Sequence, residues 1–190
     1  MNIRVILLAS LLALAACQSD QVSRDFDPGR DYSRYHFWSW MQPAVRYQPD
    51  DPRTASDLTG QRLRQAVENG LALHGLEPAS TSHPASLQVQ VWYSIEQRQR
   101  QTSSYYGGWG GGWWGSPWGG YWGGPVYDDV QTYAYQVAIV QIDLHDRTDG
   151  KLVWRGSSEY ELQKGLVSPV ERAARISRTV REILAHYPTD

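Results

Sequence analysis

The sequence predicts an α+β fold, a two-layer sandwich in which two helices cover one face of a mainly antiparallel sheet of about four strands. Some segments alternate apolar and polar residues with a period of two, which is typical of half-buried strands. Others carry an apolar stripe at helical spacing. The segments follow the order strand, helix, strand, strand, strand, helix. One-sided strands and amphipathic helices bury their apolar faces best in two packed layers, so we expect one such domain over residues 35–190.

The first strand and the first helix are predicted in the first half of this domain. The aromatic-rich segment 35–40 favours a strand, and the proline-containing segment 43–54 favours a loop. Residues 56–74 place Leu63, Val67 and Leu71 on one helical stripe. Gly75 then stands where a left-handed cap would end the helix.

Three further strands are expected after this helix. Residues 87–95 alternate with a period of two, and so do residues 133–139. The apolar phase then shifts by one residue towards 140–144, which indicates either a β-bulge near Ile139 or burial on both faces. The Asp- and Gly-rich segment 146–150 favours a turn that leads into a returning strand at 152–162.

The final helix has a clear start signal. Ser168, Pro169 and Glu171 occupy the capping, first-turn and capping-box positions. We expect the buried stripe to comprise Val170, Ala173, Ala174, Ser177, Val180, Ile183, Leu184 and Tyr187.

Residues 1–16 are predicted to be a signal peptide. A short basic start precedes the uncharged apolar run "VILLASLLALAA" at 5–16. This run is shorter than the roughly 20 residues of a membrane-spanning helix, but it fits the apolar core of a signal peptide.

The apolar run ends in Leu14-Ala15-Ala16-Cys17, which resembles a bacterial lipobox. The resemblance implies cleavage between Ala16 and Cys17, a diacylglycerol thioether on Cys17, and an acyl chain such as palmitate on the freed amine. The alternative is an ordinary secretory signal that ends in a cysteine by chance. Cys17 is the only cysteine of the chain and cannot close an intramolecular disulfide, whereas lipidation explains a lone thiol in an exported protein.

The residue after the cysteine bears on the destination of the protein. In enteric-type lipoprotein sorting, Asp at this position retains a protein in the inner membrane, so the resemblance to such lipoproteins implies export of this Gln18 protein to the outer membrane of a Gram-negative bacterium. We expect it on the periplasmic side of that membrane. The polar segment 17–34 is interpreted as a flexible tether between lipid and domain. Cleavage before Cys17 leaves a net charge of about −3, which provides no basic excess for a nucleic-acid partner.

An unusual tract lies between the second and third predicted strands. Residues 105–124 contain ten glycines, five tryptophans and three tyrosines. Glycine loosens the backbone, whereas each tryptophan carries a large apolar ring with one N–H donor. Three interpretations stay open: a tolerated variable loop, a contact surface for the membrane interface or a protein, and an aromatic platform for envelope glycans. The candidate contact residues are Trp109, Trp113, Trp114, Trp118, Tyr121 and Trp122.

The chain from about residue 31 to 188 resembles a family of bacterial lipoproteins known as domain of unknown function 4136. The resemblance rests on the segments "YHFWSW" at 35–40 and "SLQVQV" at 86–91, on the hairpin 142–156, and on the closing segment 183–188. The hairpin is its most specific part. The family implies a fold and an envelope location but brings no activity.

No catalytic or cofactor motif stands out in the sequence. There is no G-x-S-x-G elbow and no phosphate-binding lysine after a glycine loop, so we expect neither a catalytic residue nor a cofactor. The spacing of Asp143, Asp146 and Asp149 hints at calcium, but Asp/Gly turns recur for backbone reasons, and we expect no metal. The five histidines lie on different predicted elements: His36, His74, His83, His145 and His186.

These observations favour a non-enzymatic, lipid-anchored outer-membrane lipoprotein that acts as an envelope interaction or accessory module. The expected partners are the membrane, through the anchor at Cys17, and an envelope protein or glycan, through residues 105–124. The second hypothesis is a glycan- or small-ligand-binding protein that uses the aromatic tract. The third is an envelope enzyme without a recognisable motif.

Overall fold

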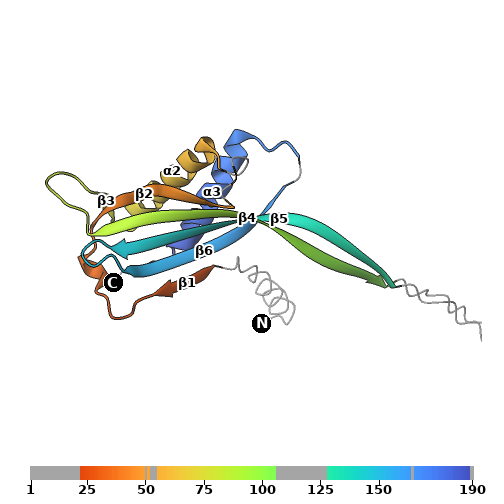
Figure 1. Cartoon of the computed structure of the whole chain (residues 1–190), viewed down its shortest axis with the longest axis horizontal. Coiled ribbons are helices and arrows are strands. Elements are labelled where there is room, and N and C mark those ends of the chain that lie inside the picture. Colours follow the sequence, from red (N-terminus) through yellow and green to blue (C-terminus); the bar gives the residue numbers. More distant parts are fainter. Residues whose placement is uncertain (1–21, 50, 52–54, 106–127, 164, 189–190) are drawn as a thin grey trace, which may run out of the picture.

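The computed structural model describes residues 22–49, 51, 55–105, 128–163 and 165–188, and its elements run along the chain as labelled in Figure 1. The N-terminal elements are β1 (Ser23–Phe26), the 3₁₀ helix η1 (Tyr32–Arg34) and β2 (Phe37–Gln48). They are followed by α2 (Asp57–Leu73), β3 (Glu77–Pro78), β4 (Leu87–Tyr105), β5 (Asp128–Asp146), β6 (Leu152–Leu162) and α3 (Pro169–Leu184).

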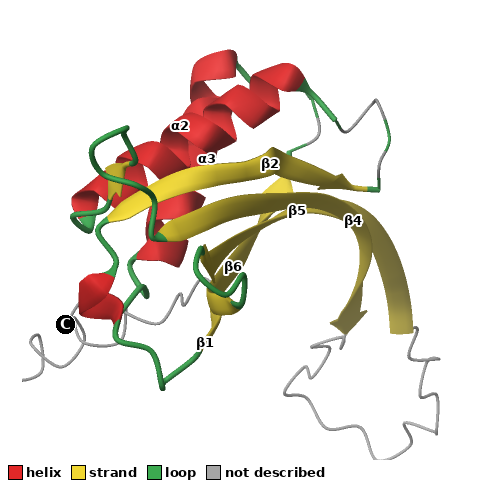
Figure 2. Cartoon of the chain, turned by 60° about the vertical axis from the view of Figure 1, so that its left-hand side comes forward, coloured by secondary structure: helices red, strands yellow, loops and turns green. Residues whose placement is uncertain are grey.

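The strands form one curved, six-stranded sheet in the order β1-β6-β5-β4-β2-β3, and both helices lie on the same face of it (Figure 2). The α+β class and the two helices on one face are confirmed. The expected count of about four strands is wrong, since the sheet has six. The sheet is also mixed: the pairs among β1, β6, β5 and β4 are antiparallel, whereas β2 pairs in parallel with β3 and β4. A parallel pair needs a long crossover, and the segment that contains α2 provides it between β2 and β4.

The segment interpreted as a flexible tether carries part of the sheet. Within 17–34, β1 pairs antiparallel with β6, from Ser23 opposite Ser157 to Phe26 opposite Trp154. All four β1 side chains are exposed, so the strand is held by its backbone and leaves no apolar pattern in the sequence. The tether interpretation is therefore wrong for residues 23–34.

Strand β2 continues beyond the predicted first strand, to Gln48. The pairing of β2 with β4 shifts register between Trp40 and Val45, and Pro43 lies inside this irregularity. Proline lacks the N–H that a regular ladder needs and is therefore found at such bulges. The loop prediction for 43–48 is wrong because Pro43 interrupts the ladder without ending the strand.

The shifted apolar phase of β5 reflects burial on both faces. The pairing of β4 with β5 is continuous past Ile139, which excludes a bulge there on that side. Val137 and Ala138 point to opposite faces, and both are buried. The alternative of two-sided burial is confirmed.

The core fills the space between the helices and the sheet. Trp154, Leu63, Leu87 and Ile142 are among its fully buried side chains. The helices approach each other at Gly70, where a Cβ atom would lie only 2.5 Å from Leu184 Cδ1. The close approach of α2 and α3 therefore explains a glycine inside α2.

The capping predictions are confirmed at both helices. Gly75 has a φ of +74° and ends α2, with the Leu76 N–H donating to the Leu71 carbonyl over 3.1 Å. The Ser168 Oγ accepts from the Glu171 N–H over 3.2 Å at the start of α3. Local hydrogen bonding thus sets these two helix ends as predicted.

The predicted stripe of α3 is correct only in its second half. Val180, Ile183, Leu184 and Tyr187 are buried, whereas Val170 is 78% exposed. The buried residues nearer the start of the helix are Ile176 and Thr179, while Ala173, Ala174 and Ser177 are exposed or half-buried. The first turn of α3 overhangs a cavity and does not pack on the sheet, which shifts the stripe towards the C-terminal half.

Candidate functional site

A two-stranded ribbon extends beyond the main sheet. The last partner of β2 is Ser94 of β4, and the last partner of β6 is Gln136 of β5. Beyond these positions β4 and β5 pair only with each other, up to Tyr105 opposite Asp128. At about 3.3 Å per residue, residues 128–135 extend the ribbon by roughly 26 Å. The ribbon bends away from the helical layer (Figure 2).

The ribbon presents rings and arginines to the solvent. Tyr133 is 54% exposed, and the Arg100 guanidinium lies 4.9 Å from the centre of the Tyr135 ring. These residues line an open hollow of about 560 Å³ together with Glu161 and other residues at the end of β6. Tyrosine rings beside arginines are common at protein contact surfaces.

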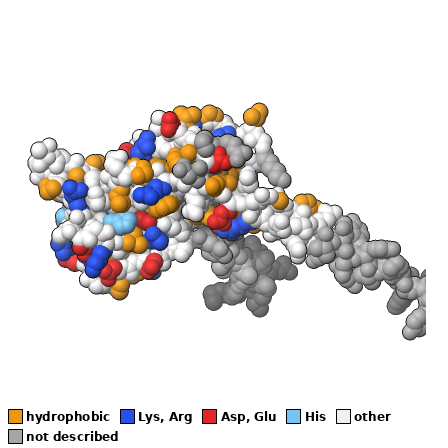
Figure 3. All heavy atoms as spheres, in the orientation of Figure 1, with side chains coloured by type: hydrophobic (Ala, Val, Ile, Leu, Met, Phe, Trp, Pro, Cys, Tyr) orange, Lys and Arg blue, Asp and Glu red, His pale blue; other side chains and the backbone are white. Residues whose placement is uncertain are grey.

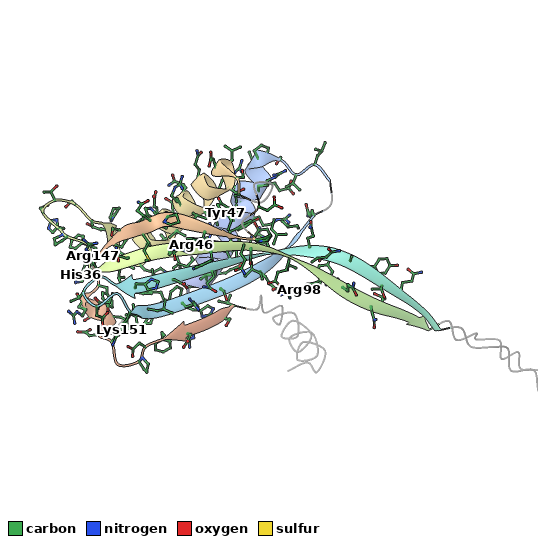
Figure 4. The ribbon with its side chains drawn as sticks, viewed as in Figure 1. His36, Arg46, Tyr47, Arg98, Arg147 and Lys151 are labelled. Carbon is green, nitrogen blue, oxygen red and sulfur yellow. The ribbon has the colours of Figure 1, made fainter. Side chains whose placement is uncertain are left out.

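An ion pair fixes the base of the ribbon. Arg98 donates to Glu159 of β6, with 2.7 Å between Arg98 Nη2 and Glu159 Oε2, and lies where the ribbon leaves the sheet (Figure 4). Arg98 also contacts Glu96 of its own strand at 3.4 Å. A half-exposed pair of this kind stabilises the fold only slightly. It joins β4 to β6 at the base of the ribbon.

The candidate contact residues of the aromatic tract lie outside the described residues. They are Trp109, Trp113, Trp114, Trp118, Tyr121 and Trp122, and all belong to the segment 106–127 that joins the ends of β4 and β5. Cys17 and Ala16 also lie outside the described part of the chain. The lipidation and cleavage site therefore stays a prediction.

The ribbon continues the face of the sheet that lies away from the helices. Trp92 of β4 is on this face, with the Arg46 guanidinium 5.2 Å from its ring centre. Asp143 and Arg155 form a two-point ion pair there, with both N···O distances 2.7 Å. In the view of Figure 3, acidic, basic and apolar side chains are interspersed over the described surface.

A second cavity lies on the helical side, where the N-termini of α2 and α3 meet the sheet. Its volume is about 570 Å³, within the range of ligand pockets. Tyr93 and Tyr160 lie in its wall, and Arg62 and Arg172 contribute from the two helices. Apolar side chains from β4, β6 and α3, including Ile95, complete the lining. The cavity therefore combines an apolar wall with positive charge.

The three aspartates that hint at calcium already bond to other groups. Asp143 pairs with Arg155, and Asp149 accepts from Arg30 at 2.6 Å. Asp146 accepts from the Tyr35 hydroxyl at 2.9 Å and from Arg30 at 3.1 Å. No cluster of three His, Cys, Asp or Glu side chains that could hold a metal occurs among the described residues.

This aspartate cluster ties the N-terminal segment to the turn between β5 and β6. Burial raises the pKa of Asp146, but hydrogen bonds from Thr148 and Tyr35 and the charge of Arg30 outweigh it and hold that pKa below its ordinary value. Burial and the bond to Asp146 raise the pKa of Tyr35 to about 12. Asp146 and Asp149, both with a lowered pKa, are therefore ionised at neutral pH, and their bonds to Arg30 hold the N-terminal segment against the turn.

The histidines do not form a common site. Burial lowers the pKa of His74, which follows α2, and the ring of His83 stacks on Phe37 with 4.6 Å between the ring centres.

Among the described helices, none is long and apolar enough to cross a membrane.

The sequence model of the family described as "Domain of unknown function (DUF4136)" matches residues 22–189. This chain belongs to the DUF4136 family. No curated protein matches it in sequence.

Several solved structures resemble the DUF4136 chain at low identity. A DUF4136 family protein from Bacteroides thetaiotaomicron is 19% identical, with a TM-score of 0.48, and the match covers 88% of this chain and 95% of that one. The PelC dodecamer from Paraburkholderia phytofirmans is 13% identical, with a TM-score of 0.44 and coverages of 86% and 94%.

A PDZ domain protein from Parabacteroides distasonis is 10% identical, with a TM-score of 0.49, and the match covers 89% of this chain. The DUF4136 chain spans only 36% of that protein. Because all three TM-scores are below 0.5, the membership rests on the sequence match alone.

Sequence patterns indicate only a small part of the ribbon and do not indicate the cavity. The run "QRQRQ" at 97–101 is polar on both faces, so no period of two marks it as a strand. Arg62 and Arg172 lie in separate helices, and each resembles an ordinary solvent-facing arginine in the sequence. Only Tyr133 and Tyr135, which alternate with polar or small residues, indicate that this part of the ribbon is a strand.

Proposed function

We propose that this DUF4136 protein is a lipid-anchored lipoprotein on the periplasmic side of the outer membrane. In this proposal it is a non-enzymatic interaction module that uses the β4–β5 ribbon and the tract at its end to contact the membrane interface or an envelope protein. The observation that carries the proposal is the ribbon, which leaves the sheet and exposes rings and arginines along its described part.

The position of β1 supports a membrane-proximal domain. Ser23 follows the proposed lipidated Cys17 by six residues, which reach at most about 20 Å when fully extended. The sheet edge at β1 would then stand close to the bilayer surface. A ribbon that adds roughly 26 Å is long enough to reach the interface or a neighbouring envelope protein from that position.

The composition of the connecting segment agrees with such a contact. Trp109, Trp113, Trp114, Trp118 and Trp122 all lie between the two ends of the ribbon. Tryptophan and tyrosine are favoured at membrane interfaces and at protein contact sites because their rings are apolar with one polar group. A lipid anchor raises the effective concentration of these rings at any membrane-bound partner.

Tryptophan emission tests this proposal. The mature chain is compared with a variant in which residues 99–134 are replaced by a short Gly-Ser linker, so that the difference spectrum reports the tract. This avoids changing Trp154, which is completely buried. We expect the difference spectrum to shift to the blue on addition of vesicles of outer-membrane lipids or of envelope extract.

A site-specific crosslinker provides the matched control. A photoreactive residue at Tyr133 of the ribbon is compared with one at Leu73 of α2, which is 75% exposed. Adducts with lipid or with an envelope protein are expected from the ribbon position only. The contact role would be contradicted by a difference spectrum that stays water-like with both vesicles and envelope extract, together with equal crosslinking from Tyr133 and Leu73. The tract would then be better explained as a tolerated loop.

A further inference from the structure

The cavity between the helix N-termini and the sheet has two phenol groups in its wall. The hydroxyls of Tyr93 and Tyr160 are 3.5 Å apart, which is long for a bond between hydroxyls. At most one of the two protons is used in this contact, so a donor is left for a ligand. Burial raises the pKa of both tyrosines, and both therefore stay protonated at neutral pH.

Positive charge surrounds these phenols. Arg62 from α2 and Arg172 and Arg175 from α3 line the cavity. Arg175 donates to the Glu161 carbonyl at 2.9 Å, and its guanidinium lies 5.8 Å from the centre of the Tyr160 ring. Within the described part of the chain, Arg62 and Arg172 have no ion-pair partner and no side-chain hydrogen bond. Two guanidiniums are thus free to bind an anion.

No acidic side chain offsets this charge in the described lining of the cavity. Asp57 and Glu171 lie in the first turns of α2 and α3, but neither lines the cavity. Both helices begin at the cavity, so their positive dipole ends add to the effect of the arginines. Ser56, the N-cap of α2, lines the cavity and makes no side-chain capping bond.

The rest of the described lining combines polar residues, Thr59, Gln136 and Gln163, with a group of apolar side chains. Ile95 and Leu162 are half-buried and come from β4 and β6, Ile176 of α3 is buried, and Leu58 at the start of α2 is 59% exposed. A small inorganic anion would leave these apolar side chains in contact with water. A ligand with an apolar body would cover them and remove their surface from water.

We propose that this cavity binds a single-chain amphipathic anion, with its carboxylate or phosphate head at Arg62, Arg172 and the tyrosine hydroxyls and its apolar chain against Ile95, Leu162 and Ile176. The site is separate from the ribbon and requires neither the lipid anchor nor the aromatic tract. Its success or failure is therefore independent of the proposed contact function.

Calorimetric titration of the soluble mature domain, with Cys17 replaced by alanine, tests the site. Octanoate, below its micelle concentration, is the probe, and monooctyl phosphate is the second head group. Octyltrimethylammonium has the same chain with the opposite charge, and acetate has the head without the chain. We expect the two octyl anions to bind at one site, and the cation and acetate to bind at least tenfold more weakly.

Variants locate the binding in the cavity. The double change Arg62→Gln and Arg172→Gln is expected to weaken octanoate binding roughly tenfold or more, because it removes charged donors. Arg178→Gln is the matched control, since this residue is exposed on the same helix and does not line the cavity. Tyr93→Phe removes one hydroxyl donor and is expected to weaken octanoate binding several-fold. For each variant, a retained cooperative thermal transition shows that the protein is folded.

The proposal is overturned if octanoate does not bind, if the octyl cation binds equally well, or if Arg178→Gln weakens binding as much as the double variant. Amide chemical shifts provide a second readout that does not depend on any variant. Octanoate should shift the signals of residues 56–62 and 165–176, and shifts confined to the ribbon would also overturn the proposal.

Discussion

At the scale of single residues, charged side chains near the turn between β5 and β6 are used to hold the chain together. Arg30 contacts Asp27, Asp146 and Asp149, and so links the N-terminal segment to this turn. Tyr35 adds a buried hydrogen bond to Asp146. The same carboxylates that suggest calcium in the sequence thus serve as partners of an arginine and of the backbone.

The first prediction concerns the acid stability that Asp146 provides. Its pKa in the folded state lies below the ordinary value of 3.8, so its contribution to stability is present above the unfolded pKa and is lost as the pH falls through the folded pKa. Asp146→Asn should lower the free energy of unfolding at pH 7 and flatten its decline below about pH 4. Urea denaturation as a function of pH measures both effects.

The control for this prediction is Glu77→Gln, at an exposed carboxylate that makes no ion pair among the described residues. This change should leave unaltered the decline of the free energy of unfolding below about pH 4 (the acid slope). An acid slope of Asp146→Asn equal to that of the wild type would show that the cluster does not depend on this charge.

The second prediction concerns the contact between helices at Gly70. Alanine stabilises a helix interior by about 1 kcal/mol relative to glycine, but overpacking a core costs about 1–3 kcal/mol. A Cβ atom at this position would meet Leu184 Cδ1 at 2.5 Å, and Leu184 is itself buried. Gly70→Ala should therefore lower the free energy of unfolding by about 0–2 kcal/mol, as measured by urea denaturation.

A double-mutant cycle with Leu184→Ala is the control at Gly70. The double variant should be destabilised by less than the sum of the single changes, because Leu184→Ala removes the clashing methyl group. A stabilised Gly70→Ala variant would mean that the two helices do not approach this closely.

At the scale of elements, the sheet separates into a packed part and a projecting part. Strand β4 pairs with β2 up to Ser94, and β5 pairs with β6 from Gln136 onwards; the remainder of each strand belongs to the ribbon. Described side chains change from buried at Val91 and Val140 to exposed at Gln101 and Tyr133. The stability of the fold should therefore depend on the packed part of each strand and not on the ribbon.

The third prediction is that the domain folds without the projecting part. Replacing residues 99–134 with a short Gly-Ser linker should leave a cooperative thermal transition with a midpoint changed by only a few degrees, since the described side chains removed contribute little buried area. Calorimetry or circular dichroism measures the transition. Val91→Ala, in the packed part of β4, should lower the midpoint more, and loss of the transition in the shortened variant would place the tract in the core.

At the scale of the whole molecule, the position of β1 limits how far the domain can stand from a membrane. The sheet begins at Ser23, so only residues 17–22 precede it in the expected mature chain. A lipid at Cys17 would therefore hold the domain close to the bilayer, because no long tether separates the two.

The fourth prediction is that Cys17 carries the anchor. Mass spectrometry of the mature N-terminus should find Cys17 as the first residue, bearing a diacylglycerol and an additional acyl chain. Cys17→Ala should give an uncleaved or mislocalised protein in membrane fractionation. An unmodified mature chain that begins at any other residue would rule out lipidation.

The sequence by itself determined the features that local interactions set. Gly75 and Ser168 end and start their helices through neighbouring backbone groups, and the turn at 146–150 and the strand at 87–95 follow from residues a few positions apart. Family membership also follows from the sequence, because its match extends over residues 22–189. The anchor at Cys17 is likewise inferred from local sequence and stays a prediction.

Only the tertiary structure decided how distant segments meet. The parallel pairing of β2 with β4, the exposed edge strand β1 and the ribbon depend on which backbones pair, and side-chain periodicity does not report the partner or its direction. Arg62 and Arg172 are far apart in the chain, and they share a cavity with Tyr93 and Tyr160 because α2 and α3 start at the same end of the sheet. Periodicity reports which face of an element is buried but not which element covers it, so this site required the fold.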